Sequence, residues 1–154
     1  MDRDCISTMR EIRGRMRKKP FDAFNVHLIR YAVIICAGAV ERAYKSIIAD
    51  YVTQNASAEI DRYVNTVVRN SKNNPRLQNI NALLKQFNEK WNDDFNREIK
   101  VRASYNMDVQ NLASLVEARN DVAHGKSVTC SLEDIIRYYL SARQLVSKLE
   151  VVLV

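Results

Sequence analysis

Apolar residues recur at every third or fourth position along most of this chain, which is the spacing that lines one face of an α-helix. The longest run of this pattern covers residues 21–53, and its apolar positions are Val26, Ile29, Val33, Cys36, Val40, Tyr44, Ile47 and Tyr51. A helix over residues 2–18 precedes it and ends near Lys19-Pro20. No segment convincingly shows the alternation of apolar and polar residues that is typical of a half-buried strand. The pattern therefore predicts an all-α protein.

Two shorter helices are predicted in the middle of the chain. Ser57 can cap the first of them, whose apolar positions are Ile60, Val64 and Val67. A polar loop over residues 70–76 separates it from the second, whose apolar positions are Leu77, Ile80, Leu84, Phe87, Trp91 and Phe95. The pattern lapses around residues 102–106, where we expect another connection.

Two more helices complete the pattern. The first is predicted to start at Asn106 or Asp108 and to end at Gly125, a residue type suited to the left-handed backbone that follows many helices. Ser131, with Asp134 three residues later, looks like the start of the last helix, whose apolar positions are Leu132, Ile135, Ile136, Tyr139, Ala142, Val146 and Leu149. The expected fold is a single domain over residues 1–154, an antiparallel bundle of five to six helices with short connections.

The composition supports one helical domain. Of the 154 residues, 47% are hydrophobic, and the chain holds only 3 Gly and 2 Pro, so long helices around a real core are expected. The most apolar stretch, residues 31–40, is too short to span a membrane. Residues 1–4 lack the residue order of a secretion signal. We therefore expect a soluble cytoplasmic protein that does not use a membrane.

The cysteines do not suggest a metal site. Cys5, Cys36 and Cys130 are widely separated, and no Cys-x-x-Cys pair or Cys/His cluster occurs. Structural zinc is therefore not expected, nor is another cofactor, and free thiols fit a reducing cytoplasm. Cys36 falls on an apolar helix face, where we expect it to be part of the core.

The formal net charge is +6, which is compatible with a polyanionic partner without requiring one. Part of this excess lies in residues 10–19, where a single acidic residue, Glu11, faces six basic ones: Arg10, Arg13, Arg15, Arg17, Lys18 and Lys19. A solvated helix face is the favoured interpretation of this segment, and a phosphate-binding surface is the alternative.

The candidate chemistry lies at the end of the helix that Gly125 terminates. With Val116 at the centre of the apolar face and about 100° per residue, Arg119 lies about 60° to one side, while Asn120 and His124 lie about 40° and 80° to the other. By the same count the face includes Val109, Leu112, Ala113 and Ala123, and Asp121 points into solvent.

Such a polar group on an apolar face is costly to bury without a purpose. An arginine can hold a phosphate, and a histidine can move protons. Three interpretations follow: the polar trio caps or bridges helices inside the bundle, it lies where the bundle opens into a cleft, or it faces a second copy of the chain. A functional site is favoured. The other histidine, His27, is expected to be a structural or surface residue.

The pattern Arg119-Asn120-(three residues)-His124 resembles the Arg-polar-x-x-x-His signature of HEPN domains. In that superfamily the motif also lies late in an all-helical bundle, ahead of a final helix. The similarity extends over the whole chain, with a long second helix, a motif helix and a capped last helix. The chain is most similar to the compact RiboL-PSP-type HEPN domains.

This resemblance implies a metal-independent endoribonuclease that leaves a 2′,3′-cyclic phosphate and works as a homodimer with two motifs in one cleft. Arg119 would bind the scissile phosphate, and Asn120 would orient groups or hold the phosphate. His124 would act in proton transfer or position the 2′-hydroxyl. Lys126 stands where some HEPN toxins carry a modifiable tyrosine, so control by that modification is not expected. Lys126 is either a further RNA contact or a solvated loop lysine.

The implied role is a toxin or antiphage defence effector that acts on RNA and is controlled by an antitoxin or another regulatory protein. One alternative is a non-catalytic HEPN module that binds RNA, a nucleotide or a partner protein. Another is a helical assembly protein in which the polar trio only fixes the register of a dimer.

Overall fold

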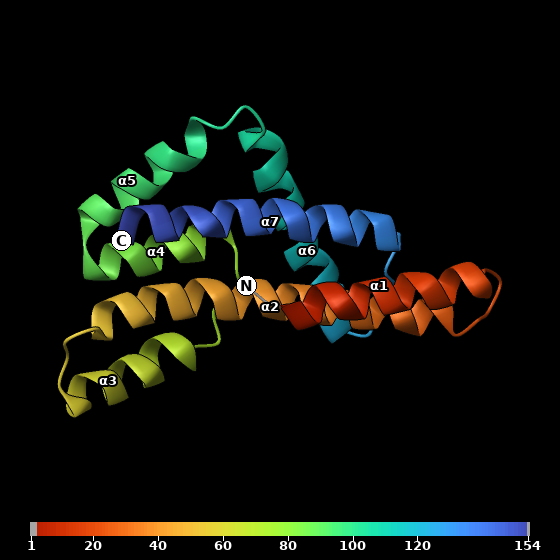
Figure 1. The fold of residues 1–154 in the computed structure, drawn as a ribbon, viewed down its shortest axis with the longest axis horizontal. Helices are drawn as coiled ribbons and strands as arrows, with labels where there is room; N and C mark the ends of the chain where they lie inside the picture. The colour runs from red at the N-terminus through yellow and green to blue at the C-terminus, as the bar shows by residue number, and fades with distance from the viewer. Residues whose placement is uncertain (1–2, 154) are drawn as a thin grey trace.

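The computed structural model describes residues 3–153, and within this range the chain forms seven α-helices, one π-helical turn and no strand (Figure 1). The elements are α1 (Arg3–Lys18), α2 (Asn25–Thr53), α3 (Ala58–Val64), η1 (Asn65–Arg69), α4 (Leu77–Phe87), α5 (Glu89–Lys100), α6 (Tyr105–Ala123) and α7 (Leu132–Leu153). The all-α fold is confirmed, with one helix more than predicted. The expected helix start at residue 2 lies outside the described residues.

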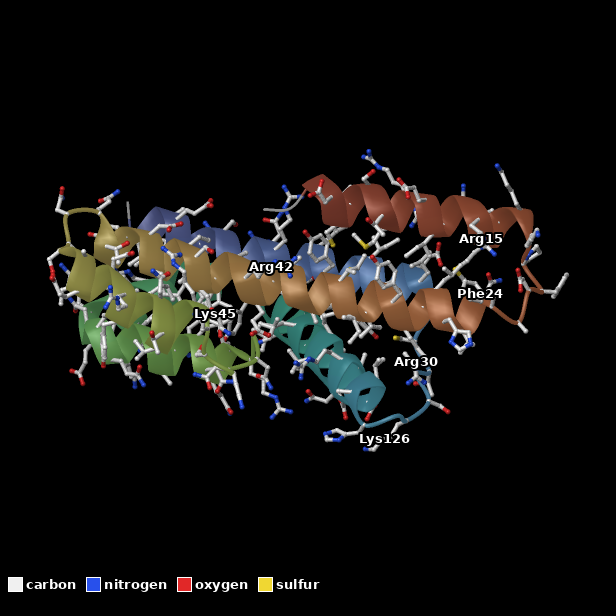
Figure 2. The ribbon with its side chains drawn as sticks, turned by 90° about the horizontal axis from the view of Figure 1, so that it is seen from below. Arg15, Phe24, Arg30, Arg42, Lys45 and Lys126 are labelled. Atoms are coloured by element: carbon white, nitrogen blue, oxygen red, sulfur yellow. The ribbon has the colours of Figure 1, made fainter. Side chains whose placement is uncertain are left out.

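The two longest helices, α2 and α7, lie side by side at the centre of the molecule (Figure 1). They run in the same direction, since both helices progress from right to left along the chain in Figure 1. The shorter α6 crosses this pair steeply and connects back to α7 (Figure 1). Figure 2 shows α1 and α6 on opposite sides of α2. The motif helix α6 and the basic first helix α1 are therefore separated by α2.

The core follows the predicted periodicity. In α7 the buried apolar positions recur every three or four residues, at Leu132, Ile135, Tyr139, Ala142, Leu145, Val146, Leu149 and Leu153. In α2 the predicted positions Val33, Cys36, Val40 and Tyr44 are fully buried, whereas Val26 is exposed. Cys36 is a free thiol in the core, as expected. The expected core is confirmed in α7 and over the middle of α2. It is wrong at Val26 and also at Ile60 and Val67, which are exposed, while Val68 of η1 is buried in place of Val67.

Two predicted helix starts are confirmed by their capping hydrogen bonds. The Ser57 hydroxyl accepts a hydrogen bond from the backbone N–H of Ile60 at the start of α3. Ser131 and Asp134 form a reciprocal pair before α7: the Asp134 N–H donates to the Ser131 hydroxyl at 3.1 Å, and the Ser131 N–H donates to Asp134 Oδ2 at 3.0 Å. Both arrangements satisfy backbone donors that a helix leaves without partners at its start.

The single helix predicted through Leu77 and Phe95 is wrong, because Asn88 divides it into α4 and α5. Asn88 has an extended backbone, with φ −162° and ψ 120°. Its N–H donates to the Leu84 carbonyl, and its side chain accepts from the Lys90 N–H at 2.9 Å. The same residue therefore ends α4 and caps α5. The apolar spacing hides this break because both helices bury their faces in one core.

The start of α6 also differs from the prediction. The helix begins at Tyr105, and Asp108 is buried in its first turn rather than capping it. The Arg102 Nε donates to Asp108 Oδ2 at 3.2 Å, and the Ser104 hydroxyl donates to the same oxygen at 2.7 Å. This polar cluster holds the connection between α5 and α6, where the apolar pattern lapses.

Among residues 3–153, no helix combines the length and the apolar character needed to cross a lipid bilayer.

Candidate functional site

The candidate site is built on the C-terminal end of α6. The backbone there forms a closed cap: the Gly125 N–H donates to the Val122 carbonyl at 3.1 Å, and the Lys126 N–H donates to the Asp121 carbonyl at 2.8 Å. Gly125 takes φ 72°, the left-handed conformation that this cap requires and that the sequence predicted. His124 immediately precedes Gly125, and its side chain is exposed. The cap therefore fixes the position from which the imidazole projects.

Arg119 and Asn120 lie on the last turns of α6, and both side chains are half-buried. The Arg119 Nη1 donates to Asn120 Oδ1 at 3.4 Å. Because the amide oxygen accepts this bond, the Asn120 NH2 group remains as a donor. His124 completes the predicted trio at the next turn, where it is exposed rather than at the edge of a buried stripe.

The buried face of α6 is rotated from the one predicted. It is centred between Leu112 and Leu115 and includes Asp108 and Asn111, whereas Ala113 and Ala123 are exposed. The reason is that α6 packs against both α2 and α7, and the Asn111 amide donates to the Ser141 hydroxyl of α7 at 2.9 Å. As a consequence, Asn120 and His124 lie farther toward solvent than expected, and Arg119 lies closer to the core.

Asp121 was expected to be solvated, but it is half-buried and forms an ion pair. The Lys126 Nζ lies 3.3 Å from Asp121 Oδ1, across the cap of α6. The Lys126 side chain is itself mostly exposed. This lysine is thus available to an anion at the helix end, in competition with Asp121.

Arg30 of α2 is a residue of this region that the sequence did not single out. Its Nη2 donates to the Val122 carbonyl at 3.4 Å, and its Nη1 donates to the Lys126 carbonyl at 3.3 Å. A positive charge is favourable there because the C-terminal end of a helix carries the negative end of its dipole. Figure 2 shows Arg30 and Lys126 at the same end of the molecule. The only sequence signal was an arginine within an otherwise apolar stretch of α2.

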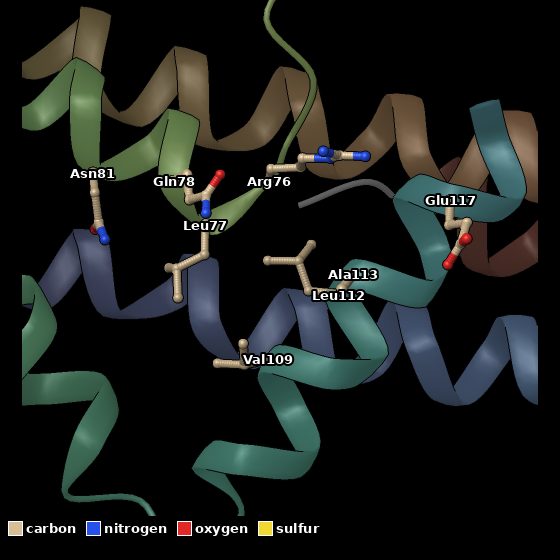
Figure 3. Close-up of a pocket in the computed structure, with 8 residues that line it drawn as sticks. All are labelled: Arg76, Leu77, Gln78, Asn81, Val109, Leu112, Ala113 and Glu117. Atoms are coloured by element: carbon tan, nitrogen blue, oxygen red, sulfur yellow. The ribbon is translucent and has the colours of Figure 1, made fainter.

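Two hollows flank the motif helix. The first is a cavity of about 460 Å³ between α4 and α6, lined by Arg76, Leu77, Gln78, Asn81, Val109, Leu112, Ala113 and Glu117 (Figure 3). The second is a hollow of about 320 Å³ between α6, the following loop and α7, lined by Ser114, Glu117, Ala118, Asp121, Val128, Thr129, Cys130 and Tyr138. Burial raises the pKa of the Cys130 thiol, so this cysteine is not an activated nucleophile.

The basic first helix lies apart from this site. Its residues Arg10, Arg17 and Lys18 are exposed, while Arg13 pairs with Glu133 of α7 at 3.3 Å. Since α1 and α6 lie on opposite sides of α2 (Figure 2), these charges do not extend the surface of the motif. His27 is exposed, and its ring lies 5.5 Å from that of Phe24. It is a surface histidine, as expected.

In the described part of the chain, no three His, Cys, Asp or Glu side chains lie together in a group that could hold a metal ion.

The chain is thus an all-helical domain with an Arg-Asn-x-x-x-His motif at the end of its penultimate helix. The sequence model of the RiboL-PSP-HEPN family matches residues 4–154, so the chain belongs to this family. Comparison with curated proteins and with solved structures found no match.

Proposed function

We propose that this protein is a metal-independent endoribonuclease whose active site consists of Arg119, Asn120 and His124. The observation that carries the proposal is the placement of these three side chains at the open end of α6, next to a cap that fixes the backbone of His124. Membership of the RiboL-PSP-HEPN family also supports this proposed function. The arrangement offers a cation, an amide donor and a proton carrier, which are the groups that RNA cleavage requires.

The chemistry uses a nucleophile that RNA itself supplies. The 2′-oxygen attacks the adjacent phosphorus as its proton is removed, the bond from phosphorus to the 5′-oxygen breaks, and the departing oxygen takes up a proton. The products are a 2′,3′-cyclic phosphate and a 5′-hydroxyl. Arg119 stabilises the added negative charge, the free Asn120 NH2 group donates to a phosphate oxygen, and His124 transfers a proton. Lys126 binds a neighbouring phosphate when it exchanges away from Asp121.

The active site is composite and forms between two copies of the chain. Arg119 and His124 are five residues apart on α6, so their side chains leave the helix about 140° apart around its axis and about 7.5 Å apart along it. One helix therefore presents the guanidinium and the imidazole on different flanks. A second copy that approaches this end of α6 places its own arginine beside the histidine of the first.

The surface next to the motif suits such a homodimer. On α2, the exposed apolar side chains Val26, Tyr31 and Ile34 are 48%, 53% and 41% accessible. Val26 and Ile34 lie one turn before and one turn after Arg30, on the same face of the helix that reaches the end of α6. Apolar residues exposed together beside a functional site are typical of a protein interface.

We further infer that the protein acts in the cytoplasm as a toxin or an antiphage defence effector. The support for this role is the similarity to HEPN domains that serve in such conflicts, and the role agrees with the RNA substrate that we propose. An antitoxin or another regulatory protein would then restrain the nuclease.

The α4–α6 cavity favours a second candidate function, a module that holds RNA or a nucleotide without cutting it. Its lining combines aliphatic and polar side chains, which is the composition of a binding pocket. Such a module would not depend on His124 for its activity.

The test is cleavage of end-labelled RNA by the purified protein in excess EDTA, beside His124→Ala and a single-stranded DNA of the same sequence. Gln110→Ala is the matched control because Gln110 is also exposed on α6 but lies outside the motif. We expect the wild type and Gln110→Ala to cut RNA alone, and His124→Ala to be slower by about a hundredfold or more. RNA that is bound but left intact by a folded wild type would instead support the binding module.

A further inference from the structure

The α4–α6 cavity has a lining that is divided by chemistry. Its floor is aliphatic and consists of Leu77 from α4 and Val109, Leu112 and Ala113 from α6. Figure 3 shows the side chains of Leu77, Val109 and Leu112 gathered between the two helices, with Arg76 and Glu117 toward the rim. The rest of the rim consists of the side-chain amides of Gln78 and Asn81. A flat apolar body with a polar edge fits such a pocket.

The cavity and the motif lie on one continuous face of α6. At about 100° per residue, Val109, Asn120 and His124 all point within about 40° of Ala113. Glu117 lines the cavity and precedes Asn120 by one helical turn, about 4.5 Å along the axis. A strand that lies across Asn120 and His124 therefore meets the cavity when it continues along the same helix.

We propose that the α4–α6 cavity is a nucleobase-binding subsite that holds a base of the RNA next to the scissile phosphate. This inference rests on the proposed nuclease function and adds the base specificity of the same site. The aliphatic floor takes the face of the base, and the Gln78 amide offers a donor and an acceptor to its edge. The Asn81 amide exchanges two hydrogen bonds of 3.4 Å with the Asn96 amide of α5, and its second N–H remains as a further donor to the base. These are the groups that read bases in single-stranded RNA.

The charges on the rim orient the nucleotide. The Arg76 side chain forms no hydrogen bond or ion pair with another residue in the described part of the chain, so its guanidinium is available to the phosphate backbone. The Glu117 carboxylate on the opposite helix repels phosphate and accepts hydrogen bonds from amino groups. The subsite therefore prefers adenine, cytosine and guanine, which carry an exocyclic amino group, over uracil.

The test uses the full chain and each of the four nucleoside 5′-monophosphates, which contain no linkage that the enzyme can cut. NMR titration follows the side-chain NH2 signals of Gln78 and Asn81 and the methyl signals of Val109. We expect the adenine, cytosine and guanine nucleotides to shift these signals at lower concentrations than the uracil nucleotide. Inorganic phosphate alone is the control for binding at Arg76.

The variant that fills the cavity is Ala113→Met, since Ala113 is exposed on the floor and methionine is a good helix former. We expect it to raise the nucleotide Kd by about tenfold or more. Ala82→Met is the matched control, because Ala82 is exposed on α4 and does not line the cavity. The control variant should bind as the wild type does.

Three results would overturn the proposal: no shift of these signals with any nucleotide, the same shifts with inorganic phosphate, or an Ala113→Met variant that changes the oligomeric state but not nucleotide binding. The last result would assign the cavity to a protein interface. If the protein binds nucleotides in the cavity but cuts no RNA, the subsite is supported and the proposed nuclease function is wrong. If it cuts RNA but binds no nucleotide in the cavity, the nuclease function is supported and the subsite is wrong.

Discussion

Gly125 is the residue on which the geometry of the site depends most directly. Its φ of 72° lies in the left-handed region, and an added Cβ there would meet no atom within 4 Å. A substitution at Gly125 therefore causes backbone strain but no steric clash with neighbouring atoms. Because His124 precedes Gly125 and caps α6, a shift of this backbone moves the imidazole.

We predict that Gly125→Ala lowers the free energy of unfolding by about 1 kcal/mol and slows RNA cleavage more than it affects RNA binding. Gly14→Ala is the matched control, because Gly14 lies inside α1 with an equally open surrounding and without a positive φ. That control should raise the free energy of unfolding by about 0.5–1 kcal/mol. Urea denaturation measures both, and two changes of the same sign would contradict the role of the left-handed cap.

Some properties of Arg119, Asn120 and His124 could be predicted from the sequence, and others could not. Their residue types and spacing were enough to predict a polar site at the end of a helix. Their exposure was not, since it depends on how α6 turns its face between α2 and α7. The spacing of apolar residues along α6 does not show that this helix packs against two other helices. The buried face predicted from that spacing was therefore rotated from the observed one.

At the scale of elements, the site depends on the contact between α2 and the end of α6. Arg30 makes this contact through the Val122 and Lys126 carbonyls, which are 92 and 96 residues away in sequence. These two hydrogen bonds link the central helix to the backbone on both sides of His124. We therefore propose that Arg30 is a positioning residue, which would act on the proposed reaction through the cap.

We predict that Arg30→Ala lowers the free energy of unfolding by about 1–2 kcal/mol and lowers kcat while KM changes little. Arg30→Lys should recover part of kcat, because an ammonium still donates to one carbonyl. Arg62→Ala serves as the control, since Arg62 is exposed on α3. A KM effect without a kcat effect would mean that Arg30 binds RNA directly rather than positioning the cap.

The elements also show where sequence analysis was limited. The helices with long apolar faces and polar starts were predicted well, as the capping bonds of Ser57 and Ser131 confirm. The break at Asn88 was missed because the apolar spacing continues through it, although asparagine is a strong cap residue. The contact of Arg30 with α6 could not be predicted, since no local pattern encodes a pairing between helices so far apart in sequence.

For the whole molecule, the central expectation is a dimer that shares its active sites. Each chain then supplies Arg119 to one site and His124 to the other. Mutation of either residue would remove that group from a dimer of identical chains. A mixed dimer of two different variants retains one complete pair across the interface.

We predict that Arg119→Ala and His124→Ala, each inactive alone, regain about a quarter of the wild-type cleavage rate when mixed in equal amounts, because half of the dimers are mixed and each holds one of two pairs. Exchange of subunits is confirmed beforehand by size-exclusion chromatography of tagged chains. Ile34→Glu in either chain should abolish the recovery, since it places a charge on the proposed interface. No recovery despite exchange would place the arginine and the histidine of each site in one chain.

The core gives the molecule a pH dependence that is independent of the site. The hydrogen bond with Cys5 and burial raise the pKa of Cys36 above its ordinary value of 9.0. Burial and the charge of Glu41 raise the pKa of Tyr44 above its ordinary value of 10.0. In the unfolded chain both groups lose their protons at their ordinary values, whereas in the folded chain they retain them. The contribution of these two groups to stability is therefore full below pH 9 and is lost as the pH rises beyond it.

We predict that each of these groups lowers the free energy of unfolding by about 1.4 kcal/mol per pH unit above its ordinary pKa. Urea denaturation over a series of alkaline buffers measures the slope. Cys36→Ala should reduce the fall in the free energy of unfolding that begins near pH 9. Because the variant is also less stable at neutral pH, its change with pH is measured from its own value at neutral pH. A curve of unchanged slope in this variant would show that another group is responsible.

The most direct test of the central claim is cleavage of an RNA oligonucleotide in which a single 2′-deoxynucleotide stands on the 5′ side of the mapped cleavage site. We predict that the wild-type protein, in EDTA, no longer cuts that linkage but still cuts an otherwise identical oligonucleotide with the 2′-hydroxyl, and leaves a 2′,3′-cyclic phosphate. Cleavage of the 2′-deoxy linkage would contradict the mechanism that we assign to Arg119, Asn120 and His124.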